Sequence, residues 1–215
     1  MAKIKAVIFD LDGTLAKTLP LCIEAFRRSV EPLINRSISD AEIIATFGPS
    51  EEGTILALAP IHYDKGVASY LYYYEQLHNM CPIPFEGMKE ILQALENKGV
   101  RIAMVTGKGK HSTDISLRHF ELTHFFKMIE TGSPKGARKA EGIRIILDGL
   151  TDIKKAEIIY VGDAPSDITA SRKVGISVVA AAWADTAESE KLQEMKPDEL
   201  FYTIKDFEDW LLDRI

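Results

Sequence analysis

Two carboxylates stand at the end of an apolar run near the start of the chain. Ala6-Val7-Ile8-Phe9 leads into Asp10-Leu11-Asp12, and Gly13 and Thr14 follow. If the run is a strand, its side chains alternate, so Asp10 and Asp12 point the same way, roughly 6 to 7 Å apart. Like charges this close repel each other unless a cation or a shared proton offsets the repulsion. The spacing therefore predicts a pair of acids that act on a ligand.

Two further apolar runs also end in polar residues. Arg101 to Val105 runs into Thr106-Gly107, and Ile158 to Val161 runs into Gly162-Asp163, with Asp167 four residues later. Taken singly, such residues often cap a helix or form a turn. In open parallel sheets, however, ligands bind beyond the carboxyl ends of the strands. We therefore expect these residues to lie beside the first pair of acids.

Together these segments resemble the signatures of the haloacid dehalogenase (HAD) superfamily, whose members are mostly Mg-dependent phosphatases. D-x-D-G-T-L at 10–15 resembles the first signature, the strand ending in Thr106 the second, and G-D-x-x-x-D at 162–167 the last. The resemblance implies that Asp10 attacks phosphorus and forms an aspartyl-phosphate, which water then hydrolyses. It also implies that Asp12 protonates the leaving oxygen and later activates that water.

A magnesium site follows from the same resemblance. Mg²⁺ prefers oxygen ligands and keeps several waters, so few protein groups suffice. Asp10, the backbone carbonyl of Asp12 and Asp163 would bind it. Asp167 would either bind the metal through water or orient its neighbours.

The resemblance further implies a phosphate site, to which Thr106 and the amide of Gly107 would donate hydrogen bonds. The family also uses a lysine, often written Lys-Pro, and this chain has no such pair in the expected region. Lys139 has about the family's spacing to the last signature and opens a helical run, so we prefer it to Lys135. Arg138 is another possible cation.

The rest of the sequence alternates strand and helix patterns, which is typical of a parallel sheet covered by helices. Strands are expected at 100–105, 128–130, 158–161 and 177–181, and helices after Gly87, from Ser112, and over 143–147, 166–174 and 204–212. The predicted fold class is α/β, with a doubly wound, Rossmann-like (HAD-like) parallel sheet. Residues 1–15 and 83–215 would form this core.

Residues 16–82 contain no convincing strand pattern and are expected to form an all-helical cap. Pro32 should disturb the first helix, and Ser39 to Glu42 has the spacing of a capping box. A tyrosine-rich face between Val67 and Leu77 is interpreted as packing in a bundle. The insertion resembles the small cap of the phosphoglycolate phosphatase and β-phosphoglucomutase branch, which would exclude water from the carboxylates.

Substrate contacts are harder to place. Lys17, Thr18, Arg27, Arg28 and the turn from Phe47 to Ser50 could contact the substrate from the cap or the hinge, but a surface or packing role is favoured for each. A small phosphorylated acid or sugar is the expected substrate class. The alternative is a phosphoglucomutase-like transfer between sugar positions. A signalling domain that accepts phosphate on an Asp is less consistent with a helical insertion.

Composition and charge further narrow the classes of protein to which this chain could belong. The chain has 215 residues, 46% of them hydrophobic, and a net charge of -6. There is no basic footprint for nucleic acid and no apolar run of the ~20 residues that span a bilayer. The first residues lack a signal-peptide pattern, so we expect a cytoplasmic enzyme. Cys22 and Cys81 are interpreted as packing residues without a disulfide. The oligomeric state is left open.

Overall fold

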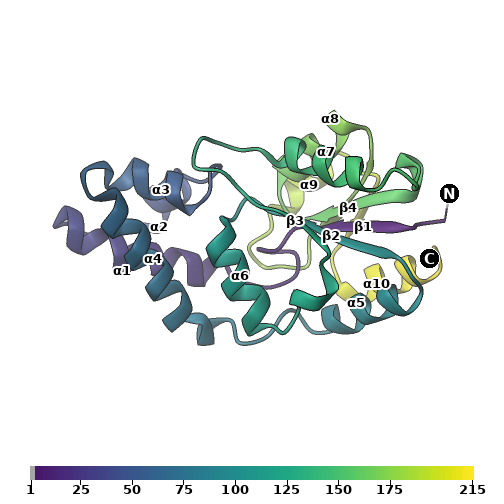
Figure 1. Cartoon of the computed structure of the whole chain (residues 1–215), viewed down its shortest axis with the longest axis horizontal. Helices are drawn as coiled ribbons and strands as arrows, with labels where there is room; N and C mark the ends of the chain where they lie inside the picture. The colour runs from purple at the N-terminus through teal and green to yellow at the C-terminus, as the bar shows by residue number, and fades with distance from the viewer. Residues whose placement is uncertain (1–2) are drawn as a thin grey trace.

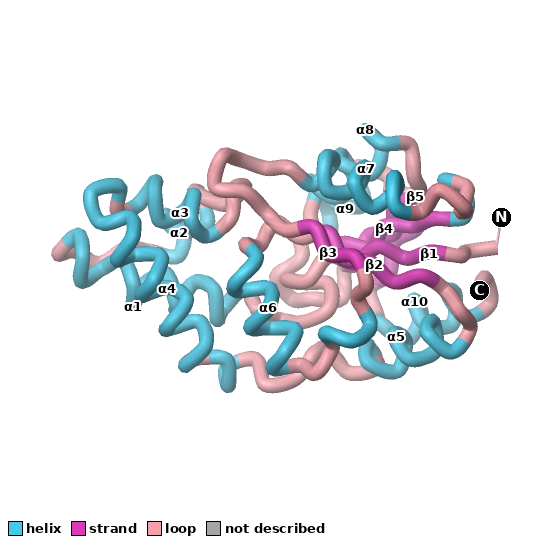
Figure 2. Tube along the Cα trace, in the orientation of Figure 1, coloured by secondary structure: helices cyan, strands magenta, loops and turns pink. Residues whose placement is uncertain are grey.

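A six-stranded parallel sheet forms the centre of the molecule (Figures 1 and 2). The computed structural model describes residues 3–215. The strands are β1 (Ala6–Phe9), β2 (Arg101–Val105), β3 (Met128–Glu130), β4 (Ile158–Gly162), β5 (Ser177–Ala181) and β6 (Glu199–Phe201). Their order is β3-β2-β1-β4-β5-β6, so the chain winds outward on both sides of β1. The predicted doubly wound α/β fold is confirmed.

Helices cover both faces of the sheet. They are α5 (Met88–Asn97), α6 (Lys110–His119), α7 (Lys139–Gly149), α8 (Pro165–Val174), α9 (Ser189–Glu194) and α10 (Ile204–Leu212). In Figure 1, α7, α8 and α9 lie above the sheet, and α5 and α10 lie below it. The side chains of β1 alternate between the two sides, with Val7 and Phe9 in one apolar cluster and Ala6 and Ile8 in the other. Burial on both faces explains why this strand is apolar throughout.

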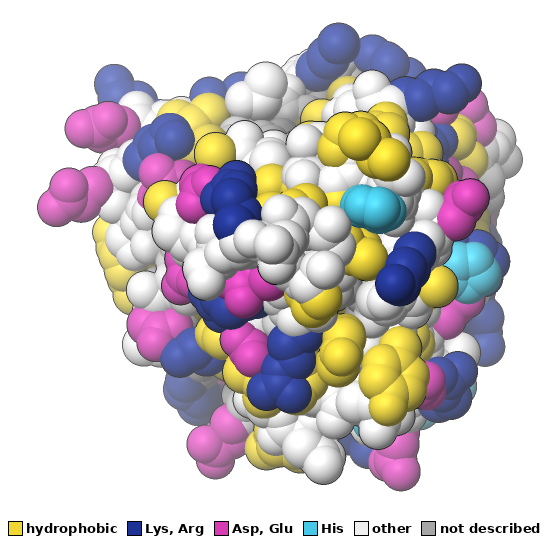
Figure 3. Space-filling view, turned by 90° about the vertical axis from the view of Figure 1, so that its left-hand side faces the viewer, with side chains coloured by type: hydrophobic (Ala, Val, Ile, Leu, Met, Phe, Trp, Pro, Cys, Tyr) yellow, Lys and Arg dark blue, Asp and Glu magenta, His cyan; other side chains and the backbone are white. Residues whose placement is uncertain are grey.

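The four α-helices that follow β1 and precede α5 lie at the left of Figure 1. They are α1 (Leu19–Ile34), α2 (Asp40–Ile44), α3 (Glu51–Leu58) and α4 (Tyr63–Gln76), with α1 packed along α4. The predicted capping box of Ser39 and Glu42 is present at the start of α2. Pro32 does not interrupt α1, which continues to Ile34, because a proline this near the end removes one backbone hydrogen bond only. The end face shown in Figure 3 carries acidic, basic and apolar side chains interspersed.

Some elements differ from the prediction. Helix α6 begins at Lys110, so Ser112 lies inside it rather than capping it. Strand β6 and helix α9 were not predicted, since both are short and polar residues interrupt them. Cys22 and Cys81 are buried and free, as predicted. Among residues 3–215, none of the helices combines the length and apolarity that crossing a membrane requires.

Candidate active site

The carboxyl ends of β1, β2 and β4 meet below the helical insertion. Asp10 follows β1, Thr106 follows β2, and Asp163 follows β4. A cavity of about 260 Å³ lies between these ends and α1, α3 and α4. It is lined by the predicted residues Asp10, Asp12, Thr106, Gly107, Lys139 and Asp163. The strand ends therefore collect in one place the residues that lie far apart in the sequence.

Asp10 is the most deeply buried of the acids that line the cavity, with 4% of its surface exposed. Its Oδ1 accepts a hydrogen bond of 2.7 Å from the backbone N–H of Leu11. Its Oδ2 lies 2.5 Å from Nζ of Lys139. Burial raises the pKa of Asp10 to about 6, although the Lys139 ammonium acts in the opposite direction. The carboxylate is thus fixed in orientation while its charge is only partly compensated.

Lys139 is the candidate cation that reaches this acid. It is the first residue of α7, and its Nζ lies 2.5 Å from both Asp10 and Asp167. Burial opposes its charge, but the two carboxylates prevail and hold the pKa of Lys139 above its usual value. Lys135 is exposed, and Arg138 instead pairs with glutamates beside β3 and in α7. The preference for Lys139 therefore agrees with the geometry.

Three carboxylates could hold a cation. Ligand oxygens of Asp10, Asp163 and Asp167 lie within 4.8 Å of one another, and such hard oxygen donors suit Mg²⁺. Burial, followed by repulsion from the other two acids, raises the pKa of Asp163 well above its usual value. Gly13, with φ of +76°, lets the chain pass close by, since a Cβ there would lie 2.0 Å from Oδ2 of Asp163. The donor set and its excess negative charge fit a divalent cation.

Asp167 has a second role in this cluster. Its Oδ2 accepts a hydrogen bond of 2.9 Å from the N–H of Ala164, before the start of α8. Its Oδ1 accepts bonds from Lys139 and from the hydroxyl of Tyr160, which is 3.1 Å away. Because both oxygens are engaged, Asp167 orients Lys139 in this arrangement, which was one of the two roles considered for it.

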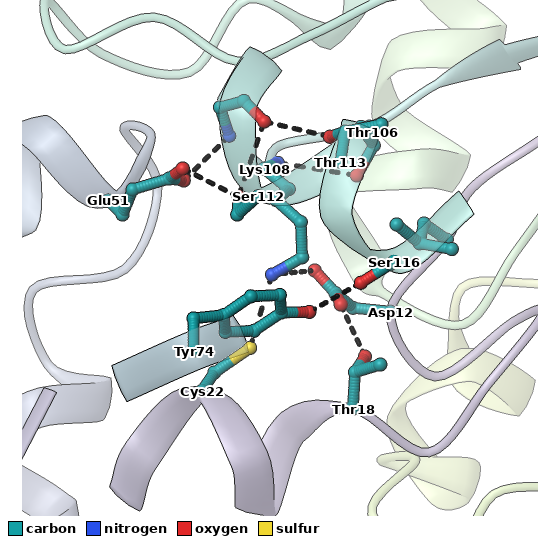
Figure 4. Close-up of polar contacts among 12 residues, drawn as sticks. Asp12, Thr18, Cys22, Glu51, Tyr74, Thr106, Lys108, Ser112, Thr113 and Ser116 are labelled. Atoms are coloured by element: carbon teal, nitrogen blue, oxygen red, sulfur yellow. Dashed lines mark hydrogen bonds and ion pairs between the residues drawn. The ribbon is translucent and has the colours of Figure 1, made fainter. Parts of the chain in front are cut away.

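Asp12 faces the helical insertion rather than the other acids. The hydroxyl of Thr18, before α1, donates to its Oδ1, and Nζ of Lys108 lies 3.3 Å from its Oδ2 (Figure 4). Thr18 is therefore not a surface residue, and its contact with Asp12 agrees with the hinge position that was the less favoured interpretation. It is fully buried and holds Asp12 where the chain enters the insertion.

Lys108 was not identified from the sequence. Lys108 is 6% exposed, and its Nζ lies 3.2 Å from Sγ of Cys22 and 4.4 Å from the ring centroid of Tyr74 (Figure 4). Burial opposes its charge, but the carboxylate of Asp12 prevails and raises the pKa of Lys108 above its usual value. A lysine two positions after Thr106 has no local pattern that separates it from a surface lysine. Its burial depends on contact with α1 and α4.

Thr106 and Gly107 border the same cavity from the end of β2. Thr106 is 2% exposed, and its Oγ1 accepts a hydrogen bond of 3.2 Å from the N–H of Lys108. Its own hydroxyl proton is free to point toward a ligand. Gly132 packs directly against this loop, where a Cβ would lie 1.9 Å from the carbonyl oxygen of Gly107. Because Gly132 has no side chain, its backbone can lie directly against the loop at Gly107.

Glu51, also missed in the sequence, joins the insertion to the core. From the start of α3 it accepts 2.6 Å and 2.5 Å hydrogen bonds from the N–H of Gly109 and the hydroxyl of Ser112 (Figure 4). Next to it, the N–H of Ser50 donates to the carbonyl of Ser133 at 3.0 Å. These bonds hold the insertion against the core at the carboxyl ends of the strands.

Some residues of the insertion line the cavity, although the sequence favoured a surface or packing role for them. Phe47, Gly48 and Pro49 are among the lining residues, so the turn from Phe47 to Ser50 is not only a surface or packing segment. Tyr70 and Tyr74 pack in the bundle as predicted, with ring centroids 5.7 Å apart. Tyr70 also lines the cavity. Lys17 is exposed and pairs with Asp185, as a surface residue would.

The sequence of this chain matches the family model described as haloacid dehalogenase-like hydrolase over residues 7–181. The chain belongs to that family. A protein of Caldanaerobacter subterraneus, assigned provisionally by its name to the PpaX pyrophosphatases, is 32% identical and covers 99% of this chain and 94% of its own length. Pyrophosphatase PpaX of Anoxybacillus flavithermus is 28% identical and covers 94% of both chains.

The fold of this haloacid dehalogenase-like hydrolase also matches solved structures. CbbY of Rhodobacter sphaeroides, crystallised with phosphate, superposes with a TM-score of 0.75 at 18% identity, over 92% of this chain and 93% of its own. At that identity the likeness concerns the fold alone. The family resemblance predicted from the three strand ends is confirmed, and the chain is an enzyme of the hydrolase class.

Proposed function

We propose that this chain is a Mg²⁺-dependent phosphatase that hydrolyses a small phosphorylated metabolite through an aspartyl-phosphate on Asp10. The observation that carries the proposal is the pairing of Asp10 with Lys139 inside a cluster of three carboxylates, in the cavity between the strand ends and the helical insertion. A buried nucleophile, a fixed cation and a second acid are what phosphoryl transfer needs. In this proposal, residues 16–82 act as the cap over a core made of residues 1–15 and 83–215.

The first half-reaction uses both acids of the first signature. Oδ of Asp10 attacks phosphorus, the bond from phosphorus to the leaving oxygen breaks, and Asp12 gives its proton to that oxygen. Lys139 offsets negative charge at the attacked phosphoryl group, while Thr106 and the N–H of Gly107 donate to its oxygens. When bound to Asp10, Asp163 and the carbonyl of Asp12, Mg²⁺ would supply further positive charge at the phosphoryl oxygens.

The second half-reaction restores the enzyme. Water attacks the phosphorus of the aspartyl-phosphate, and Asp12, now ionised, accepts the proton of that water. Thr18 donates a hydrogen bond to Oδ1 of Asp12, and Nζ of Lys108 lies 3.3 Å from its Oδ2, so both hold this carboxylate in place. Phosphate leaves, and Asp10 returns to its pair with Lys139.

The choice of a first substrate follows from size and from the relatives. A cavity of about 260 Å³ is consistent with a small substrate. Two relatives bear the name of pyrophosphatases, which makes pyrophosphate the first compound to test.

The test is phosphate release from pyrophosphate and from an aryl phosphate, with Mg²⁺ and with excess chelator. We expect metal-dependent turnover by the wild type and none by Asp10→Asn. Asp185→Asn, which changes an exposed acid paired with Lys17, serves as the matched control and should retain full activity. Acid-quenched wild type should carry a hydroxylamine-sensitive phosphoryl group that Asp10→Asn lacks. Full activity of Asp10→Asn would refute the proposal. Incubation with a sugar phosphate tests the alternative, since a mutase would yield an isomer without releasing phosphate.

A further inference from the structure

Tyr160, in the middle of β4, places a hydroxyl group inside the apolar core. The side chain packs in the cluster that the sheet forms with α7 and α8, and none of its surface is exposed. A phenylalanine would fill the same space, whereas a buried hydroxyl costs free energy unless it has a hydrogen-bond partner. What this hydroxyl contributes therefore depends on the groups that it contacts.

The hydroxyl of Tyr160 lies between two elements of the proposed site. It donates to the backbone carbonyl of Val105 at 2.8 Å, and Oδ1 of Asp167 is a second acceptor at 3.1 Å. Val105 is the last residue of β2, directly before Thr106. Asp167 contacts Nζ of Lys139 at 2.5 Å. One hydroxyl group thus joins the strand end that carries Thr106 to the acid that orients Lys139.

The ring of Tyr160 and the carboxylate of Asp167 are packed closely together over Gly162. A Cβ at Gly162 would lie 2.8 Å from Cε1 of Tyr160 and closer still to Oδ2 of Asp167. Both groups therefore occupy the space of a missing side chain and have little room to move. Burial, followed by the charge of Asp167, raises the pKa of Tyr160 well above its usual value. The phenol therefore keeps its proton at neutral pH and remains a donor.

Loss of this donor would free the carboxylate of Asp167 more than it would free the strand. The carbonyl of Val105 is fixed by its place in β2. Oδ2 of Asp167 accepts from the N–H of Ala164, but Oδ1 would then be held only by the side chain of Lys139. Rotation of this carboxylate would move Nζ of Lys139 relative to Asp10, where the transferred phosphoryl group would lie.

We infer that Tyr160 is a positioning residue for the proposed phosphoryl transfer: its hydroxyl group fixes Asp167, and through it Lys139, relative to the end of β2. This inference rests on the proposed phosphatase function and deepens it. Tyr160 is not among the residues that line the cavity, so it would act on the reaction only through these neighbours. Because Lys139 offsets charge at the attacked phosphoryl group, the effect should fall on kcat rather than on KM.

The first test is Tyr160→Phe, which removes the hydroxyl group and keeps the ring. It is assayed with Mg²⁺ on whichever of pyrophosphate and the aryl phosphate the wild type hydrolyses faster. We expect kcat to fall roughly tenfold, as for the loss of a hydrogen bond to a charged group, while KM stays within about twofold of the wild type. An unchanged kcat, or a change in KM alone, would overturn the inference.

A double-mutant cycle with Asp167→Asn separates positioning from packing. In the Asp167→Asn background, Tyr160→Phe should lower kcat by less than about threefold, because the carboxylate that it fixes is already lost. Tyr74→Phe is the matched control, since it removes another buried hydroxyl group, which lies 2.7 Å from Oγ of Ser116. Its effect on kcat should be the same in both backgrounds. An equal loss from Tyr160→Phe in both backgrounds would show that Tyr160 does not act through Asp167.

A second measurement does not depend on the folding of Tyr160→Phe. Tyrosine isotopically labelled at Cζ and placed at position 160 alone should change its NMR resonance in Asp167→Asn, since Cζ carries the hydroxyl group. An unchanged resonance would overturn the inference and leave the phosphatase proposal intact. The phosphatase proposal fails separately, by a wild type that releases phosphate from neither compound with Mg²⁺.

Discussion

Replacing Asp10 by Asn should stabilise the metal-free protein while it removes activity. The acid is 4% exposed and lies in a cluster of three carboxylates with one lysine. Asn has nearly the same shape and no charge. The substitution therefore removes a repulsive, desolvated charge from the folded state and leaves Lys139 paired with Asp167.

The magnitude follows from the pKa of Asp10, which burial raises from 3.8 to about 6. One pKa unit corresponds to about 1.4 kcal/mol, so ionised Asp10 costs the folded state roughly 3 kcal/mol at pH 7 relative to the unfolded chain. Because the folded pKa is the higher one, this cost is absent below pH 4 and grows as the pH rises to about 6. The free energy of unfolding of Asp10→Asn should exceed that of the wild type by roughly 1–3 kcal/mol at pH 7 and match it near pH 4.

The assay is urea denaturation with excess chelator at both pH values. Asp185→Asn is the control, because Asp185 is exposed and its loss should alter neither result. Saturating Mg²⁺ should reduce or reverse the difference at pH 7, since the metal stabilises only the protein that binds it well. The reasoning is refuted if Asp10→Asn is less stable than the wild type at pH 7 without metal. It is also refuted if the stabilisation is the same at both pH values.

Three further substitutions test the surroundings of the cavity. Lys139→Met should lower the kcat of phosphate release by roughly 10²- to 10³-fold. Lys135→Met should leave that kcat within about threefold of the wild type. Equal effects of the two substitutions would contradict the assignment of Lys139. Glu51→Gln removes the charge that accepts two hydrogen bonds from α6 and should lower kcat/KM by about tenfold. Glu52→Gln is its control, and an unchanged substrate-saturation curve for Glu51→Gln would show that this bond does not hold the insertion over the cavity. Gly132→Ala should lower the melting temperature and weaken binding of inorganic phosphate, because the new Cβ would lie 1.9 Å from the carbonyl oxygen of Gly107. A melting temperature and a phosphate affinity equal to those of the wild type would contradict this.

The sheet and the acids were predictable because their signals are local. An apolar run followed at once by Asp10, Thr106 or Asp163 places the polar residue at a strand end, and parallel strands bring those ends together. Lys139 was predictable from its place at the start of a helix, although the sequence alone left Lys135 as a competitor. In the structure Lys139 lies beside Asp10 and Lys135 is exposed, which supports the preference for Lys139 as a proposal.

The contacts between the insertion and the core were not predictable in the same way. Glu51 and Ser112 are 61 positions apart in the sequence, and no pattern within either helix indicates that they meet. Lys108 is buried only because α1 and α4 pack against it, so its own neighbours in the sequence carry no signal. The contact of Thr18 with Asp12 was not predictable from the sequence for a similar reason, since no pattern around Thr18 separates it from a surface or packing threonine.

The central position of β1 has a consequence for how the protein acquires its active site during synthesis. In the sheet, Ala6 pairs with Arg101 on one side and with Ile158 on the other. The strand that leads to Asp10 is therefore synthesised before both of the strands with which it pairs. Contacts between such distant segments slow folding, because long loops must close before they form. The nucleophile is thus made before the strands that enclose it, and a chain truncated before β4 would expose the apolar strand β1 along one edge.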